Sequence, residues 1–331
     1  MTRRSFSAPA VLLAGLVACS NAGAKLTLPN LASGGIAVGV YLDRNGTHAL
    51  DKGDTVLAGV RLALLVPGGS DTLRTATTND QGVATFDSLS IGTYRLVVDR
   101  LAAGDSIGTV AGDTGVVRLT GNPDSLARSR LIRLGFAELS IAEARTQPAG
   151  RRVLIHGKVV SPRQAFRDSS AFVLDTSGSI RITGAVGQPG SAGNNIGDSV
   201  LVLGTTGQEE GQGVLIGGLF TTISGGLAPL PKLLSVTAAR TADGGAADAE
   251  LVQLSNVVIT DTISATPDFI LKVADPGTPD VTITVLLDQL LNAPRSLFPP
   301  GRTGTFRGVL IPVGDGTWIL KPRGALDIIL N

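Results

Sequence analysis

The sequence predicts an all-β protein: an N-terminal β-sandwich followed by two small Greek-key barrels, each opened by a short helix. Glycine is abundant, with 43 residues in 331, while aromatic residues make up only 4%. Short runs of Val, Ile, Leu and Thr alternate with Gly, Asp-Gly and Pro-Gly, which is typical of short strands joined by tight turns. From about residue 138 the chain repeats itself, which indicates two copies of one domain.

The chain opens with a secretory leader. Arg3 and Arg4 form a basic start, and residues 8–17 are apolar and uncharged. This stretch is shorter than the roughly 20 apolar residues that span a bilayer, and its length fits a cleaved signal peptide. We therefore predict a signal peptide over residues 1–18 and a flexible tether over residues 19–35.

The leader ends in a motif that includes the only cysteine of the chain, Cys19. The run Leu16–Cys19 resembles the lipobox of bacterial lipoproteins, in which the cysteine is acylated and the peptide is cut before it. The resemblance implies a lipid-anchored envelope protein, in the outer membrane because Ser20 rather than Asp follows. The alternative is an ordinary secretory peptide cut near Ala22 or Ala24.

Charge and cysteine content limit the function classes. The precursor has 28 basic and 27 acidic residues, and removal of Arg3 and Arg4 leaves 26 against 27. A nearly neutral chain argues against a nucleic-acid-binding surface, which normally carries a strong basic excess. Because no cysteine follows Cys19, the rest of the chain has no disulfide, cysteine-metal site or cysteine nucleophile.

Residues 36–134 are expected to form the β-sandwich and a connector. The alternation of Val60, Leu62 and Leu64 predicts a strand with one buried face. The region resembles the B-type repeat domains of Gram-positive surface adhesins, the SD-repeat and collagen-adhesin B families, and their prealbumin-like relatives. The matching segments are Val40–Gly46, Leu50–Asp54, Leu57–Leu62, Thr77–Gly82, Phe86–Leu89 and Gly92–Leu96.

A calcium-type loop lies within this domain. Oxygen donors occupy positions one, three, five, seven, nine and twelve, the order of an EF-hand loop. These donors are Asp43, Asn45, Thr47, the Ala49 carbonyl, Asp51 and Asp54. B-type repeats bind calcium at such a loop, so the resemblance implies calcium here. His48 replaces the usual glycine at position six, and Asp54 replaces the usual glutamate at position twelve; both changes weaken a calcium site. The alternative is that the segment is a solvated acidic connector between strands.

The repeat divides the rest of the chain into residues 138–234 and 235–331. Matching pairs begin with Ser140–Thr146 and Ser235–Thr241, and continue through four strand-like segments to Gly213–Ile216 and Thr317–Leu320. Within the first copy, His156–Val159, Phe172–Asp175 and Gly197–Gly204 resemble the OB-like domains of bacterial lipoproteins and of proteins that accompany secreted nucleases. The resemblance implies a helix followed by a five-stranded barrel.

Catalytic groups are scarce. The chain has two histidines, His48 and His156, and neither lies in a recognisable triad motif or near a Gly-x-Ser-x-Gly elbow. Glu209 and Glu210 are adjacent in a polar hairpin, whereas a glycosidase pair needs a set separation across a cleft. No phosphate-binding glycine motif is present. We therefore predict a non-enzymatic protein without catalytic residues.

We predict that the chain consists of modular β-domains, which either bind a ligand at the cell envelope or act as a spacer there. The expected partners are the membrane, through the lipid anchor, and an unidentified envelope protein or polysaccharide. The alternative is an accessory component of extracellular degradation that binds nucleic acid or glycan through aromatic and cationic side chains. The candidates are Phe166, Phe172, Phe220, Lys158, Arg163, Arg167, Arg181, Phe269, Phe298, Phe306, Trp318, Lys321 and Arg323. We expect most of the Phe side chains in barrel cores and Lys321 to Arg323 on a solvated edge.

Overall fold

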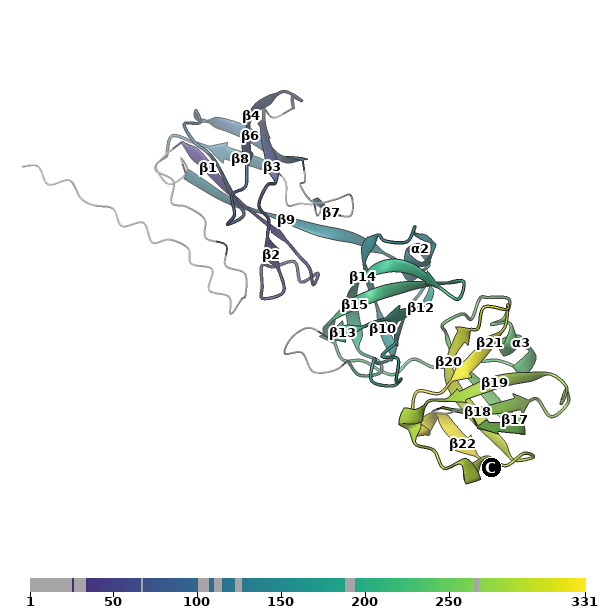
Figure 1. Ribbon diagram of the computed structural model, residues 1–331. Helices are drawn as coiled ribbons and strands as arrows, with labels where there is room; N and C mark the ends of the chain where they lie inside the picture. Colours follow the sequence, from purple (N-terminus) through teal and green to yellow (C-terminus); the bar gives the residue numbers. More distant parts are fainter. Residues whose placement is uncertain are drawn as a thin grey trace, which may run out of the picture. The chain divides into compact units, whose positions relative to one another are not determined.

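The predicted all-β class is confirmed by the computed structural model. The described residues form three sheets and two short α-helices, α2 (Ile141–Thr146) and α3 (Val236–Arg240) (Figure 1). The structure describes residues 26, 34–66, 68–100, 107–109, 115–122, 127–187, 194–264 and 268–331. The signal peptide, Cys19 and, apart from Leu26, the tether up to residue 33 therefore lie outside the described residues.

The chain divides into two compact units. The first comprises residues 1–43, 47–104 and 109–135, and the second comprises residues 44–46, 105–108 and 136–331. Both copies of the predicted repeat fall in the second unit. One strand, β9 (Ala127–Leu139), contributes residues to each unit.

The first unit contains the four-stranded sheet and some strands of the 11-stranded sheet, which also includes the strands of the first barrel. Strand β1 (Gly35–Leu42) pairs in parallel with β9 and antiparallel with β2 (Thr55–Val56) and β5 (Val83–Phe86). The short strand β7 (Ile107–Thr109) also pairs with β9. The four-stranded sheet has the order β4 (Thr72–Thr77), β3 (Arg61–Leu65), β6 (Gly92–Arg100), β8 (Val116–Leu119). The buried face predicted from the alternating pattern is confirmed, because Val60, Leu62 and Leu64 are at most 2% exposed.

The first barrel follows helix α2. Its strands are β10 (Arg152–Ser161), β11 (Ala171–Asp175), β12 (Gly178–Thr183), β14 (Ser199–Glu209) and β15 (Gln212–Ser224). The strands close in the order β10, β11, β12, β15, β14 and back to β10, with only the β12–β15 pair parallel. The short β13 (Val186–Gly187) adds to β15. The expected hairpin forms because Glu210 and Gly211 both adopt positive φ, as a two-residue turn requires.

The second barrel follows α3 and closes in the same order. Its strands are β17 (Leu251–Ser264), β18 (Phe269–Ala274), β19 (Thr282–Leu287), β20 (Thr303–Pro312) and β21 (Trp318–Lys321). Only the β19–β21 pair is parallel within the closed ring. The additional elements are β16 (Lys232–Leu233), β22 (Ile328–Leu330) and the 3-10 helices η1 (Gln289–Leu291), η2 (Arg295–Leu297) and η3 (Ala325–Asp327).

Each helix is fixed to its barrel by the same two devices. The hydroxyls of Ser140 and Ser235 cap α2 and α3, and Glu143 completes a capping box in the first copy. Behind each helix an aspartate at the end of the second strand accepts the first helical amide. Asp175 Oδ2 accepts from Ile141 N at 2.9 Å, and Asp275 Oδ2 accepts from Val236 N at 2.9 Å.

These aspartates correct the residue-level alignment of the two copies. The sequence pairs Phe172 with Phe269, but the equivalent capping bonds pair Asp175 with Asp275, which shifts the second strand by three residues. Strand β17 carries one extra residue opposite β20, between Leu254 and Val257, whereas the equivalent pairing of β10 with β14 has no such bulge. Asn256 lies in that bulge with a φ of 55°, a conformation that asparagine tolerates.

We expect Asp175→Ala to lower the free energy of unfolding of the second unit by about 1.5 kcal/mol. The change removes the acceptor for the first amide of α2 and for the Ser177 and Gly178 amides. Urea denaturation of the chain measures this loss. Asp280→Ala, at an exposed position, is the matched control and should change stability by less than about 0.5 kcal/mol. Equal effects of the two variants would contradict the capping role.

Candidate functional site

The two barrels share a buried apolar patch, here called the seam. The first barrel contributes outward-facing side chains of β10 and β11 and of the 162–170 loop, and the second contributes outward-facing side chains of β17 and β20 and of the segment just before β17. The buried members are Val160, Phe166, Phe172, Ala249, Leu251, Val309 and Ile311. Phe166 and Phe172 meet edge to face with ring centroids 5.9 Å apart. The expectation that most Phe side chains lie in cores is confirmed, although these two fill the seam and not a barrel.

A buried lysine lies at one end of the seam. Lys321 of the second barrel is 6% exposed, and its Nζ lies 3.1 Å from Asp288 Oδ2 and 3.6 Å from Asp168 Oδ2. The same Nζ lies 4.4 Å from the centre of the Phe166 ring. Asp288 Oδ2 also accepts from the backbone amide of Arg167 at 3.1 Å. The cluster thus ties the 162–170 loop of the first barrel to β21 and η1 of the second.

The two carboxylates of this cluster are held in the ionised form. Burial acts to raise the pKa of Asp288, but the Leu290 and Arg167 amides and Lys321 outweigh it, so the pKa lies below its usual range. Burial likewise opposes ionisation of Asp168, and the hydrogen bonds from Ser170 together with Lys321 lower its pKa overall. Because both folded-state pKa values are depressed, these groups stabilise the fold above the usual Asp pKa, and this contribution is lost as the pH falls.

A second polar cluster centres on Asp248, which is 6% exposed. Arg145 of helix α2 forms an ion pair with Asp248 Oδ2 and also donates to the Ser179 carbonyl at 2.9 Å. Gln212 Nε2 and Trp318 Nε1 both donate to Asp248 Oδ1, at 2.9 and 2.7 Å. Arg145 and Gln212 belong to the first barrel, and Asp248 and Trp318 to the second. The Asp248 carboxylate therefore joins the barrels through two side chains of the first barrel, Arg145 and Gln212.

The prediction of a solvated edge from Lys321 to Arg323 is wrong. Arg323 donates to the Val160 carbonyl of the first barrel at 2.8 Å and forms two bonds of 2.8 Å with Asp327. Both cations lie in the seam because each finds a carboxylate there, without which burial of the charge would be costly.

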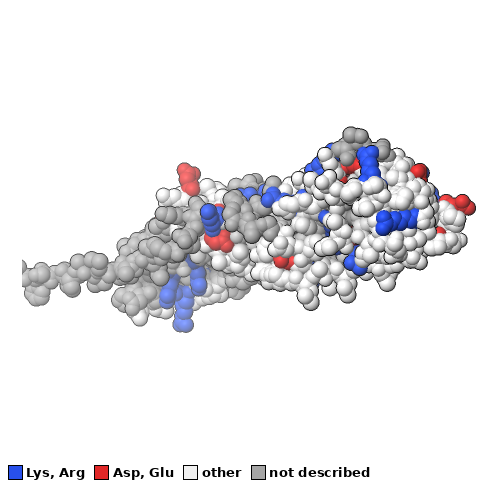
Figure 2. Space-filling model, turned by 90° about the horizontal axis from the view of Figure 1, so that it is seen from below, with Lys and Arg blue, Asp and Glu red and all other residues white. Residues whose placement is uncertain are grey.

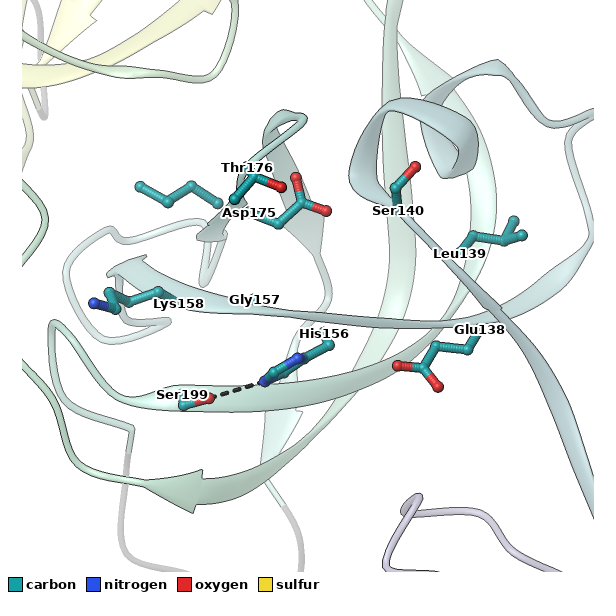
Figure 3. A pocket seen from close by; sticks show the side chains of 10 residues that line it. Glu138, Leu139, Ser140, His156, Gly157, Lys158, Asp175, Thr176 and Ser199 are labelled. Atoms are coloured by element: carbon teal, nitrogen blue, oxygen red, sulfur yellow. Dashed lines mark hydrogen bonds between the residues drawn. The ribbon is translucent and has the colours of Figure 1, made fainter.

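An open hollow of about 630 Å³ lies on the first barrel (Figure 3), and Leu174, which packs against the seam, forms part of its lining. His156 and Lys158 point outward from β10, and Glu138, Thr176 and Ser199 line the same hollow. His156 Nε2 lies 2.9 Å from Ser199 Oγ, so the predicted strand histidine has a hydroxyl partner from the neighbouring strand. Both residues lie on regular, paired strands, and this contact fixes the exposed imidazole against β14.

Asp175 also lines this hollow, but its carboxylate already accepts hydrogen bonds from backbone amides. Burial acts to raise its pKa, but hydrogen bonds from Ser177, Ile141 and Gly178 outweigh this and lower the pKa overall. A carboxylate that accepts several backbone amides is a poor proton acceptor at neutral pH. We therefore assign the Asp175 carboxylate the role of capping the start of α2.

The acidic loop predicted to bind calcium has two buried carboxylates. Asp43 and Asp54 are 5% and 6% exposed. Asp43 Oδ2 accepts from the His48 amide at 3.0 Å, and Asp54 Oδ2 accepts from the Asp51 amide at 3.0 Å.

Three other predicted calcium ligands of this loop form hydrogen bonds among themselves. Thr47 Oγ1 donates to Asp51 Oδ2 at 2.6 Å and lies 3.2 Å from the Ala49 carbonyl oxygen. His48 has a φ of 65° at the position where an EF-hand loop has glycine. Within the described ranges, no three His, Cys, Asp or Glu residues lie close enough to hold a metal ion.

Charged side chains on the face in view are scattered, with basic and acidic groups interspersed (Figure 2). This distribution agrees with the nearly neutral composition. In the part of the chain that the structure describes, no helix is both long and apolar enough to cross a membrane.

Comparison with known proteins gives remote structural similarity only. No family model and no curated protein matches the chain. Similar solved structures include the group B streptococcus pilus 2b backbone protein, with 19% identity over 31% of this chain and 41% of that chain and a TM-score of 0.23. The major pilin SpaD from Corynebacterium diphtheriae has 11% identity over 90% and 63%, with a TM-score of 0.24. The p202 HIN1 domain in complex with a 12-mer double-stranded DNA has 12% identity over 52% and 88%, with a TM-score of 0.28. At these values none of the similarities assigns a function.

We expect Lys321→Met to lower the free energy of unfolding of the second unit by about 3 kcal/mol, because it leaves buried carboxylates without their cation. Unfolding below pH 5 should also become less dependent on pH, since Lys321 helps to depress the pKa of Asp168 and Asp288. Urea titrations at several pH values measure both effects. Lys158→Met, on the outer surface of β10, is the control; an equal loss in both variants would refute the role of the seam lysine.

Proposed function

We propose that the chain is a non-enzymatic protein of the bacterial cell surface, lipid-anchored at Cys19, whose double barrel acts as one rigid binding or spacing body. The observation that carries the proposal is the seam. It joins the two barrels through buried apolar side chains and two ionic clusters, which suits a body that keeps its geometry. The lipobox-like run Leu16–Cys19 supports the lipid anchor. We propose that this anchor attaches the protein to the outer membrane.

The seam also bears on the alternative of a nucleic-acid- or glycan-binding accessory protein. OB-fold barrels bind such ligands on the second and third strands and on the loops after the first and fourth strands. In the first barrel the counterparts are β11, β12, the 162–170 loop and the β14–β15 turn. Phe172 and Phe166 from these elements contact the second barrel, as does Gln212 at the start of β15. A ligand at this face of the first barrel would have to displace a domain of the same chain, which supports a spacing role for the first barrel.

The anchor is tested by mass spectrometry of the mature N-terminus. We expect the membrane-extracted protein to begin at Cys19. We also expect two or three acyl chains on this residue, because a single chain gives only marginal membrane binding. Cys19→Ser should release the protein from the membrane fraction. A mature chain that begins at Ser20 or later, or an unmodified Cys19, would contradict the proposal.

We further propose that the Asp43–Asp54 loop binds calcium weakly. Support comes from the oxygen order and from two carboxylates, Asp43 and Asp54, that the fold already buries. The shorter Asp54 at the last position and the internal hydrogen bonds of Thr47 and Asp51 favour an affinity in the millimolar range typical of extracellular modules. Calcium would compete with these bonds for the same oxygens.

Calcium at about 10 mM should raise the melting temperature of the first unit by about 3 °C, because a ligand of the native state stabilises it by mass action. The measurement is a thermal melt of the chain from Ser20 onward, with magnesium as the ionic control. Asp51→Ala should abolish the shift, while Asp80→Ala, in an exposed turn outside the loop, should keep it. An unchanged melting temperature in calcium, or a shift that survives Asp51→Ala, would exclude the site.

A further inference from the structure

Four arginine side chains gather at one edge of the first unit, where β8 ends the four-stranded sheet. Arg95 of β6 lies directly opposite Val116 of β8, and Arg118 lies two residues further along β8, on the same face of the sheet. From β9 of the other sheet, Arg130 Nη2 lies 3.5 Å from the Val116 carbonyl oxygen. Arg128 lies two residues before Arg130 and points to the same side of β9. These four arginines are here called the arginine edge.

The charges of the arginine edge are exposed and are not neutralised by carboxylates. All four side chains are exposed to solvent, and among the described residues none of them forms an ion pair. Asp99, which lies on the same face of β6 as Arg95, pairs with Arg61 at 3.0 Å. Residues 115–122 and 127–137 contain no Asp or Glu. This edge therefore carries a locally positive potential, although the whole chain is nearly neutral.

The chemistry of arginine and the burial of the aromatic rings indicate which kind of polyanion fits this edge. A guanidinium binds a carboxylate or phosphate group through two parallel hydrogen bonds. Proteins that bind single-stranded nucleic acid add exposed aromatic side chains, on which the bases stack. The described part of the first unit has three aromatic residues, Tyr41, Phe86 and Tyr94, and each is at most 8% exposed. With cations and without a stacking surface, the edge suits a charged sugar polymer better than nucleic acid.

We propose that the arginine edge binds a linear anionic polysaccharide of the cell envelope, with successive anionic groups of the polymer paired to successive arginines. The proposal rests on the proposed function, because it takes the protein to lie at an envelope, and it names the class of partner bound there. An exposed ion pair contributes little by itself, but several pairs to one polymer chain add their contributions. Salt screens exposed charges, so binding should weaken as the ionic strength rises.

The test uses the unacylated chain from Ser20 onward and fluorescein-labelled alginate, a linear polysaccharide in which every sugar carries a carboxylate. Fluorescence anisotropy measures the affinity, and we expect binding at low salt but none to labelled neutral dextran. The patch variant should bind alginate about tenfold more weakly, since each exposed ion pair contributes about twofold. This variant keeps Arg130 and its contact with β8 and combines Arg95→Gln, Arg118→Gln and Arg128→Gln.

A charge-matched control removes three cations from the second unit and should leave the affinity for alginate unchanged. It combines Arg163→Gln, Arg240→Gln and Lys272→Gln, none of which lies at the arginine edge. If circular dichroism shows that the patch variant is unfolded, Arg118→Gln alone should weaken binding about twofold.

Three results would overturn the proposal. The first is that the parent chain does not bind alginate at low salt, and the second is that the patch variant and the control variant lose affinity equally. The third is that the parent chain binds oligothymidylate more tightly than alginate and loses both through the patch variant, which would assign the edge to nucleic acid. Because this chain lacks Cys19, the outcome is independent of the mass spectrometry that tests the anchor.

Discussion

The double barrel depends on Lys321, which pairs with Asp288 of its own barrel and with Asp168 of the first barrel. A cation in an apolar environment is stable only when carboxylates pair with it and hydrogen bonds satisfy the remaining atoms. Here the carboxylates come from both barrels, since Asp168 follows β10 and Asp288 precedes η1. Separation of the barrels would therefore expose Phe166 and Phe172 and break the Lys321–Asp168 pair at the same time, and this coupling makes the two domains one body.

The closed seam limits where a ligand can bind the first barrel. Phe172 of β11 and Phe166 of the 162–170 loop are buried against the second barrel, so neither ring is open to a ligand while the seam is closed.

Periodic features were predictable from the sequence, while contacts between distant segments were not. The strand alternation at Val60, Leu62 and Leu64 and the helix openings at Ser140 and Ser235 depend on neighbours in sequence, and both were found where expected. Lys321 looked like a solvated edge because its partner Asp168 lies far away along the chain and in the other barrel. Separation along the chain is also why the sequence did not predict that His156 contacts Ser199 or that Arg145 pairs with Asp248. The equivalence of Asp175 with Asp275 was not predicted either, because it rests on hydrogen bonds to helices that lie far away along the chain.

The most direct test of the seam is hydrogen exchange at one backbone amide, that of Arg167. This amide lies in a loop of the first barrel and donates to Asp288 of the second at 3.1 Å. If the seam is closed and stable, the Arg167 amide should exchange as slowly as that of Val173 in the barrel core, because both require unfolding of the double barrel. Exchange of the Arg167 amide at the rate of an open loop, with the Val173 amide still protected, would show that the barrels separate and would contradict the closed seam.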